Sequence, residues 1–136
     1  QPLTKSKFLA ASQKRNTTVP VNAVAATMHD LFHAQWERRH GSALGLKAFL
    51  RAASTPRSSL EKKAAEDWAD NLAFRAVVVL ALDRFMDQAG DEAVAPVRES
   101  VAQALALSLQ YLPEPKVLAL SKVLMKMAAY EEKEPG

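Results

Sequence analysis

The chain has 136 residues, of which 49% are hydrophobic and 7% aromatic, with a formal net charge of +3 and no cysteine. Without cysteine there can be no disulfide framework and no zinc site built on thiolates. No stretch reaches the roughly 18 uninterrupted apolar residues of a membrane span, and the presence of only four glycines favours an all-helical fold.

The charge is unevenly distributed along the chain. Residues 1–20 contain four basic residues and no acidic one, which predicts a basic leader or linker. The remaining 14 basic and 15 acidic residues leave the rest nearly neutral. A nucleic-acid-binding fold is expected to carry basic residues on its own surface, so the net charge gives little support for DNA binding by this unit. Because it begins with Gln1, we expect the chain to be a piece of a longer protein.

Apolar spacing predicts two helices in the first half of the folded part. After Pro20, apolar residues recur at three- and four-residue steps up to Phe32, which predicts a first helix. A tight turn at Ala34 and Gln35 then leads into a second helix over about 36–53. The inner face of this second helix is expected to hold Trp36, His40, Ala43, Leu44, Leu46, Phe49 and Leu50.

The second helix contains two glycines, Gly41 and Gly45. Each costs about 1 kcal/mol of helix propensity relative to alanine, so we expect a neighbouring backbone to approach closely there. Residues 54–69 are predicted to be a linker and a short helix. A further helix over about 70–88 is apolar nearly all round, which indicates burial between two neighbouring helices.

Two more helices are predicted in the last third of the chain. One spans about 95–111 and begins with Pro96, a residue favoured in the first helical turn. The other spans 116–131 and has an apolar stripe but no following helix to cover it. We therefore expect a helical array that continues beyond this helix.

The two halves of the chain repeat one pattern. Asp30 near the end of one helix and Arg39 at the start of the next recur as Asp83 and Arg98. Paired helices repeated in this way are typical of HEAT repeats, which span about 40–47 residues. The spacings here, 53 and 59 residues, are longer because of the linker and a longer second turn. We expect the four charged residues to form a ladder of ion pairs or caps between adjacent repeats.

The predicted fold class is all-α, an α-solenoid of HEAT repeats in which antiparallel helix pairs form a right-handed superhelix. The predicted organisation is a basic leader or linker (1–20), a HEAT repeat (21–53), a linker and short helix (54–69), a second HEAT repeat (70–112) and the first helix of a truncated repeat (116–131).

The sequence offers no motif for catalysis. It has no Gly-x-x-x-x-Gly-Lys-Ser/Thr phosphate loop and no serine in a nucleophile-elbow pattern. His29 and His33 flank Asp30, which superficially resembles a zinc-binding His-Glu-x-x-His helix, but surface and capping roles are favoured. We predict no catalytic, cofactor-binding or metal-binding residue in this chain.

Two segments resemble one known family. The first is Asp30-Leu31-Phe32 followed by WERRHGSALGLK at residues 36–47; the second joins ALDRF at 81–85 to VAPVRESVAQ at 94–103. Both resemble, in the same order, segments of the Swi/Snf-type ATPases that dissociate TATA-binding protein from promoter DNA. The resemblance covers roughly residues 21–112. It implies a piece of the N-terminal HEAT domain, which grips TATA-binding protein through its inter-helix turns.

The resemblance implies a nuclear, protein-binding fragment of a transcription regulator that is not itself an enzyme. The ATPase that engages DNA, with its ATP and Mg²⁺, is expected in a C-terminal part outside this chain. Further HEAT repeats are expected on both sides, and no membrane contact. Because TATA-binding protein has a basic convex face, acidic turns suit it. The predicted partner-binding residues are Gln35, Trp36, Glu37, Asp87, Asp91 and Glu92.

Two alternative functions stay open at this point. One is a HEAT or armadillo scaffold from another system, such as a transport receptor or a phosphatase scaffold. The other is a small metal-dependent helical enzyme, in which His29 and His33 would be the first candidate ligands.

Overall fold

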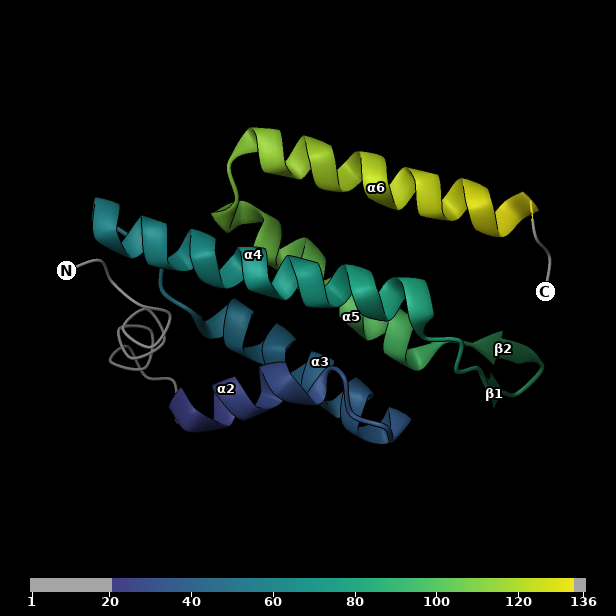
Figure 1. Ribbon diagram of the computed structural model, residues 1–136. Coiled ribbons are helices and arrows are strands. Elements are labelled where there is room, and N and C mark those ends of the chain that lie inside the picture. The colour runs from purple at the N-terminus through teal and green to yellow at the C-terminus, as the bar shows by residue number, and fades with distance from the viewer. Residues whose placement is uncertain (1–20, 134–136) are drawn as a thin grey trace.

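The computed structural model describes residues 21–133 and confirms the predicted all-α class (Figure 1). The predicted basic leader at 1–20 lies outside the described residues. The elements in chain order are α2 (Val21–Asp30), α3 (Trp36–Ala52), α4 (Ser59–Leu82), β1 (Asp87–Ala89), β2 (Glu92–Val94), α5 (Pro96–Ser108), the 3₁₀ helix η1 (Leu109–Tyr111) and α6 (Glu114–Lys133).

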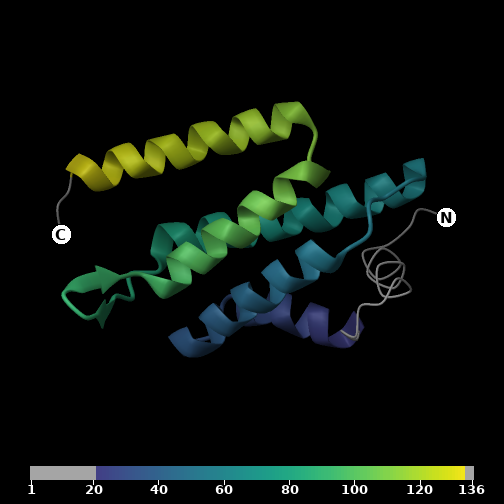
Figure 2. The same cartoon turned by 180° about the vertical axis from the view of Figure 1, so that it is seen from behind.

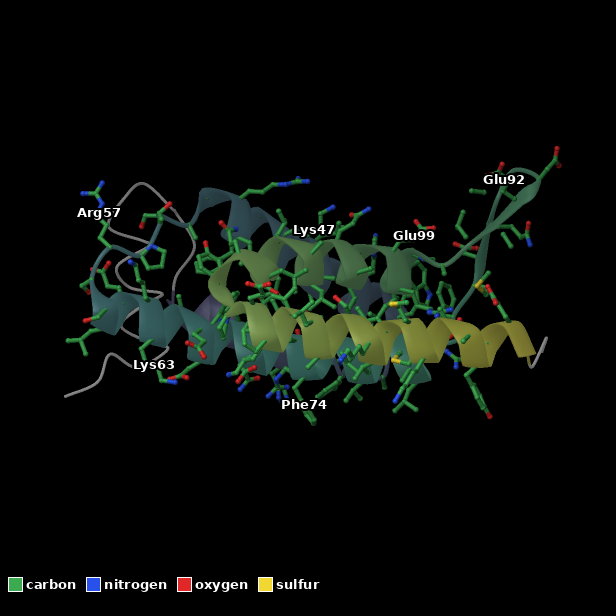
Figure 3. All side chains as sticks on the ribbon, turned by 90° about the horizontal axis from the view of Figure 1, so that it is seen from above. Lys47, Arg57, Lys63, Phe74, Glu92 and Glu99 are labelled. Atoms are coloured by element: carbon green, nitrogen blue, oxygen red, sulfur yellow. The ribbon has the colours of Figure 1, made fainter. Side chains whose placement is uncertain are left out.

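The helices form two layers. Figures 1 and 2, which view the molecule from opposite sides, show α2 and α4 in one layer and α3 and α5 in the other. Helices α2 and α3 run antiparallel, as do α4 and α5, and α6 lies over the second pair (Figures 1 and 3). Two stacked antiparallel pairs followed by a fifth helix is the element order that the predicted repeats require. The division into HEAT repeats and the handedness of a superhelix stay predictions.

The expected separation of a short helix in 54–69 from a helix at 70–88 is wrong. Helix α4 begins at Ser59 and continues without a break to Leu82. Its start is fixed by Ser58, whose side chain accepts a hydrogen bond from the Glu61 backbone N–H at 3.1 Å. One buried stripe runs through the expected boundary, so packing keeps the helix continuous there: Ala64, Ala65, Trp68, Ala69, Leu72, Ala73, Ala76 and Val79.

The end of α4 also differs from the prediction. The helix stops six residues before Gln88, and residues 87–94 form a β-hairpin instead. Asp87 pairs with Val94 and Ala89 with Glu92 in an antiparallel register. Gly90 has a φ of +66°, a left-handed conformation that glycine adopts at little cost, and this allows the tight turn between the strands.

The core joins α3, α4 and α5 through large and very small side chains. Phe49 of α3 meets Trp68 of α4 edge-on, with ring centroids 5.4 Å apart. Alanines at the helix contacts are fully buried, which allows the helices to approach closely. From α6, Leu120 and Leu124 pack partly buried against this core. The predicted inner face of α3 is correct except for Leu44, which is exposed.

Only one of the two α3 glycines lies at a close approach. A Cβ on Gly45 would meet the Thr27 methyl group of α2 at 3.3 Å, whereas one on Gly41 would meet nothing within 4 Å. The neighbouring Ser42 hydroxyl donates to the Thr27 carbonyl oxygen. The tight α2–α3 contact therefore centres on Gly45 and Ser42. The expectation of a close neighbouring backbone is wrong for Gly41, and at Gly45 the close neighbour is a side chain.

Replacing the central aromatic of the core should strongly destabilise the fold. Phe49→Ala removes a buried ring that packs on Trp68, and we expect a loss of about 3–5 kcal/mol in the free energy of unfolding. Phe74→Ala on α4 is the matched control, because Phe74 is 69% exposed. Urea denaturation followed by circular dichroism measures both. Equal effects of the two variants would contradict this description of the core.

Candidate protein-interaction surface

The turns within the two helix pairs, α2–α3 and α4–α5, lie at one end of the molecule, which we name the turn edge. The α3–α4 and α5–α6 connections lie at the other end (Figure 1). The turn edge comprises residues 31–37, residues 83–95 with the hairpin, and the last turn of α6, residues 129–132, all on the right in Figure 1. The six residues predicted to bind a partner lie on this edge, distributed over its first two segments.

Arg39 joins the first two segments of the turn edge. Its Nε donates to Asp83 Oδ2 at 2.6 Å, and the Asp83 side chain is only 3% exposed. The same guanidinium donates to the backbone carbonyl oxygens of His33 and Ala34 at 2.8 and 2.9 Å. Asp83 Oδ1 in turn accepts from the Phe85 backbone N–H at 3.0 Å. One ion pair therefore fixes the turn before α3 and the end of α4 together.

Trp36 lies against the base of the hairpin segment. Its ring stacks on Phe85 with centroids 4.2 Å apart and an interplanar angle of 14°. One turn along α3, His40 Nδ1 lies 3.1 Å from the Pro96 carbonyl oxygen and 3.0 Å from Ser100 Oγ of α5. Trp36 and His40 therefore connect the two helix pairs. Much of the Trp36 surface that could meet a partner is used in this internal packing.

The hairpin presents three exposed carboxylates. Asp87, Asp91 and Glu92 are all exposed, and both strands are open to solvent along most of their length. Figure 3 shows Glu92 on a hairpin that projects beyond the ends of the helices. Asp87 Oδ1 accepts from the Gln88 backbone N–H at 2.8 Å. In the first turn, Gln35 and Glu37 are exposed beside the half-buried Trp36.

Arg98 makes the second charged contact of the turn edge. It donates from Nη2 to Glu131 Oε1 of α6 at 2.7 Å, and Arg84 Nη1 lies 3.6 Å from the same oxygen. The hydrogen bond from Arg98 outweighs partial desolvation and lowers the pKa of the Glu131 carboxyl. Arg98 Nε is buried and has no hydrogen-bond partner within the described part of the chain.

The four residues expected to form a ladder of ion pairs do not all pair with one another. Arg39 and Asp83 form one contact, and Arg98 reaches Glu131, which the sequence analysis did not single out. The half-buried Asp30 forms no ion pair within residues 21–133. Each paired arginine lies near the start of one α-helix and contacts an acid at the end of the next α-helix. Phe85 was also missed, although its place in Asp83-Arg84-Phe85 repeats that of Phe32 after Asp30.

The described residues offer no metal centre. Among residues 21–133, no three or more His, Cys, Asp or Glu side chains come together as a ligand set. His33 Nδ1 accepts a hydrogen bond from the Gln35 backbone N–H at 3.0 Å, so this nitrogen helps to close the turn. None of the helices in that range is both long and apolar enough to cross a membrane.

This edge and the stacked helix pairs define the class of the protein: an all-α protein whose exposed inter-helix turns form its most distinctive surface. The chain is 39% identical over 111 residues to the human TATA-binding protein-associated factor 172. It is 40% identical over 107 residues to TATA-binding protein-associated factor mot1 of Aspergillus fumigatus, and 34% identical over 116 residues to MOT1 of Saccharomyces cerevisiae.

These matches cover 74–80% of this chain but only 6% of each relative. Over the matched residues, the chain is homologous to TATA-binding protein-associated factors of the Mot1 family, which confirms the sequence resemblance. No protein-family model matches it. No solved structure matches it significantly.

Removing Arg39 should destabilise the fold because it would leave the buried Asp83 carboxylate without its ion-pair partner. For Arg39→Ala we expect a loss of about 3–5 kcal/mol in the free energy of unfolding, the usual cost of breaking a buried ion pair on one side. The adjacent Arg38 is exposed, and Arg38→Ala should change stability by less than about 0.5 kcal/mol. Thermal and urea denaturation measure both variants. A small effect of Arg39→Ala would show that Asp83 is adequately solvated.

The Arg98–Glu131 contact should give the fold a dependence on pH. Because the folded-state pKa of Glu131 is lowered, its contribution to stability is present above the ordinary glutamate pKa of about 4.3 and is lost as the pH falls through the lowered value. The stability difference between the wild-type protein and Glu131→Gln should therefore be constant near neutral pH and shrink below about pH 4.

Urea denaturation at several pH values measures this difference. Glu132→Gln, at the exposed neighbouring position, controls for the loss of a charge at the same helix end. A difference that does not change with pH would contradict a charge-dependent contact between Arg98 and Glu131.

Proposed function

We propose that this chain is a HEAT-repeat segment of a nuclear transcription regulator and that it binds TATA-binding protein through the turn edge. The binding would work by complementary shape and charge and would involve no chemical reaction. The observation that carries this proposal is the similarity to proteins that are named as associated with TATA-binding protein.

The hairpin supports the proposal through its charge. Asp87, Asp91 and Glu92 are exposed on a projecting loop, and the resemblance implies a partner with a basic convex face. Complementary charges of this kind raise association rates and select the correct partner. The base of the loop is held by the Arg39–Asp83 ion pair and the Trp36–Phe85 stack, so the loop would lose little freedom on binding.

The removal of TATA-binding protein from promoter DNA would be the work of an ATPase outside this chain. The 136 residues contain no phosphate-binding loop of the Walker type, so ATP and Mg²⁺ would be bound elsewhere in the parent protein. Contact with DNA would be indirect. In this proposal the segment holds the partner while force is applied by a distant domain.

A binding titration of this chain against purified TATA-binding protein tests the proposal. We expect saturable binding that weakens as the salt concentration rises, because exposed charges are screened. Reversing two hairpin charges, Asp91→Lys/Glu92→Lys, should weaken binding by about tenfold or more at low salt. Isothermal calorimetry or fluorescence anisotropy measures the affinities.

The matched control reverses two acids away from the turn edge. Asp67 lies in the first half of α4 and Glu114 at the start of α6, so Asp67→Lys/Glu114→Lys changes the net charge equally. It should leave binding nearly unchanged. Equal losses in both double variants would indicate a non-specific charge effect. Absence of binding by a protein with a normal helical circular dichroism spectrum would reject the proposed contact.

A further inference from the structure

A groove runs between α4 and α6 beside the turn edge. It shares Arg84, Tyr130 and Glu131 with that edge but contains none of the six residues predicted to bind a partner. It consists of two adjoining hollows of about 350 and 400 Å³ that share Val123. The apolar lining comes from Ala73, Phe74, Val77 and Ala81 of α4 and from Ala119, Leu120, Val123, Met127 and Tyr130 of α6. We name this surface the α4–α6 groove.

Two exposed aromatic side chains stand at the ends of the groove. Phe74 is 69% exposed and Tyr130 is 62% exposed. Figure 3 shows Phe74 projecting outward from α4 at the edge of the molecule. Exposed aromatic and methionine side chains around an apolar hollow are characteristic of protein-binding surfaces. Along α6 the groove extends over residues 116–131, about 22 Å at the helical rise, which suits about four turns of a second helix.

The two ends of the groove differ in charge. At the Phe74 end, Lys116 contacts the carboxylates of both Glu66 and Asp70, at 3.2 and 2.7 Å. At the Tyr130 end, Arg84 and Lys126 line the hollow with Glu131. Arg98 and Arg84 both contact this carboxylate, and Lys126 lines the same hollow with no ion pair to an acid among residues 21–133. The Tyr130 end therefore has an excess of positive charge.

We propose that the α4–α6 groove binds an amphipathic helix of a partner protein, with apolar side chains in the two hollows and a carboxylate side chain at the Tyr130 end. Helices bind apolar grooves through residues spaced three and four apart. The carboxylate would pair with Lys126 and Arg84 and would balance the excess positive charge at this end of the groove.

Two other occupants fit the groove less well. Residues 1–20 of this chain contain no acidic side chain, so they lack the carboxylate that the Tyr130 end requires. A helix that stacked on α6 as α6 stacks on α4 would cover the other face of α6. That face carries the exposed Leu118 and Met125, which line neither hollow.

A designed peptide pair tests the proposal with the full chain. The probe is a fluorescein-labelled helical peptide of about 14 residues, with leucines spaced three and four apart and two glutamates at one end. Its counterpart carries lysines in place of the glutamates. Fluorescence anisotropy at low salt should show saturable binding, with the acidic-ended peptide bound at least about tenfold more tightly.

Three variants of α6 locate the binding. Val123→Glu places a charge where the hollows meet and should abolish binding, whereas Leu118→Glu on the other face should leave it unchanged. These positions are 43% and 55% exposed, so neither change introduces a charge into the core. Lys126→Glu should reduce or reverse the preference for the acidic-ended peptide, and circular dichroism checks that each variant folds.

The proposal is overturned if both peptides bind alike or if Val123→Glu binds as the wild type does. It is also overturned if sedimentation shows a dimer that Val123→Glu dissociates and Leu118→Glu does not, because the occupant would then be a second copy of the chain. These measurements contain no TATA-binding protein. Their outcome is therefore separate from the test of the proposed function.

Discussion

The ion pair between Arg39 and Asp83 is the contact on which the relative position of the two helix pairs depends. The Asp83 carboxylate is almost fully buried, and a buried carboxylate is costly unless it is paired and hydrogen-bonded. Arg39 also satisfies two carbonyl oxygens of the preceding turn. The guanidinium thus constrains the end of α2, the start of α3 and the end of α4 at once. A displacement of one pair against the other would break the charge-assisted hydrogen bond from Arg39 to Asp83, whereas the bonds to His33 and Ala34 lie within the first pair.

The contact between Arg98 and Glu131 repeats this arrangement in a weaker form. Its carboxylate is over a third exposed and is shared with Arg84, and the Arg98 Nε lacks a partner in the described structure. Exposed ion pairs stabilise a fold far less than buried ones whose partners are all satisfied. Helix α6 accordingly packs on the core mainly through Leu120 and Leu124. It leaves an open groove beside α4.

The sequence was sufficient to predict the helices whose apolar residues recur regularly. Helices α3, α5 and α6 begin and end within a few residues of the predicted bounds. The continuous α4 was missed because the predicted boundary between residues 69 and 70 falls inside one buried helix face, which runs through Trp68, Ala69 and Leu72. The hairpin was missed because its strands are three residues long and exposed, so no alternation of buried and exposed residues marks them.

The candidate site could be predicted only as a set of positions along the chain. The acids Asp87, Asp91 and Glu92 were predicted to lie in the second turn, and they are exposed in the hairpin there. The internal use of Trp36 was not predicted, because its partner Phe85 is 49 residues away in the chain and no local pattern specifies that stacking. Glu131 was missed for the same reason: its arginine partner belongs to another helix. Contacts between distant segments are fixed by how the helices stack, which spacing alone does not determine.

Two adjoining surfaces at this end of the molecule carry opposite charges. The hairpin carries three exposed acids, while the Tyr130 end of the α4–α6 groove has more cations than anions. A basic ligand drawn to the hairpin would be repelled from the groove, and an acidic helix drawn to the groove would be repelled from the hairpin. Arg84, which lines the groove, lies three residues before Asp87 of the hairpin in the chain. Two ligands of opposite charge could therefore occupy neighbouring sites without competing, and a single partner would have to match both charges in one orientation.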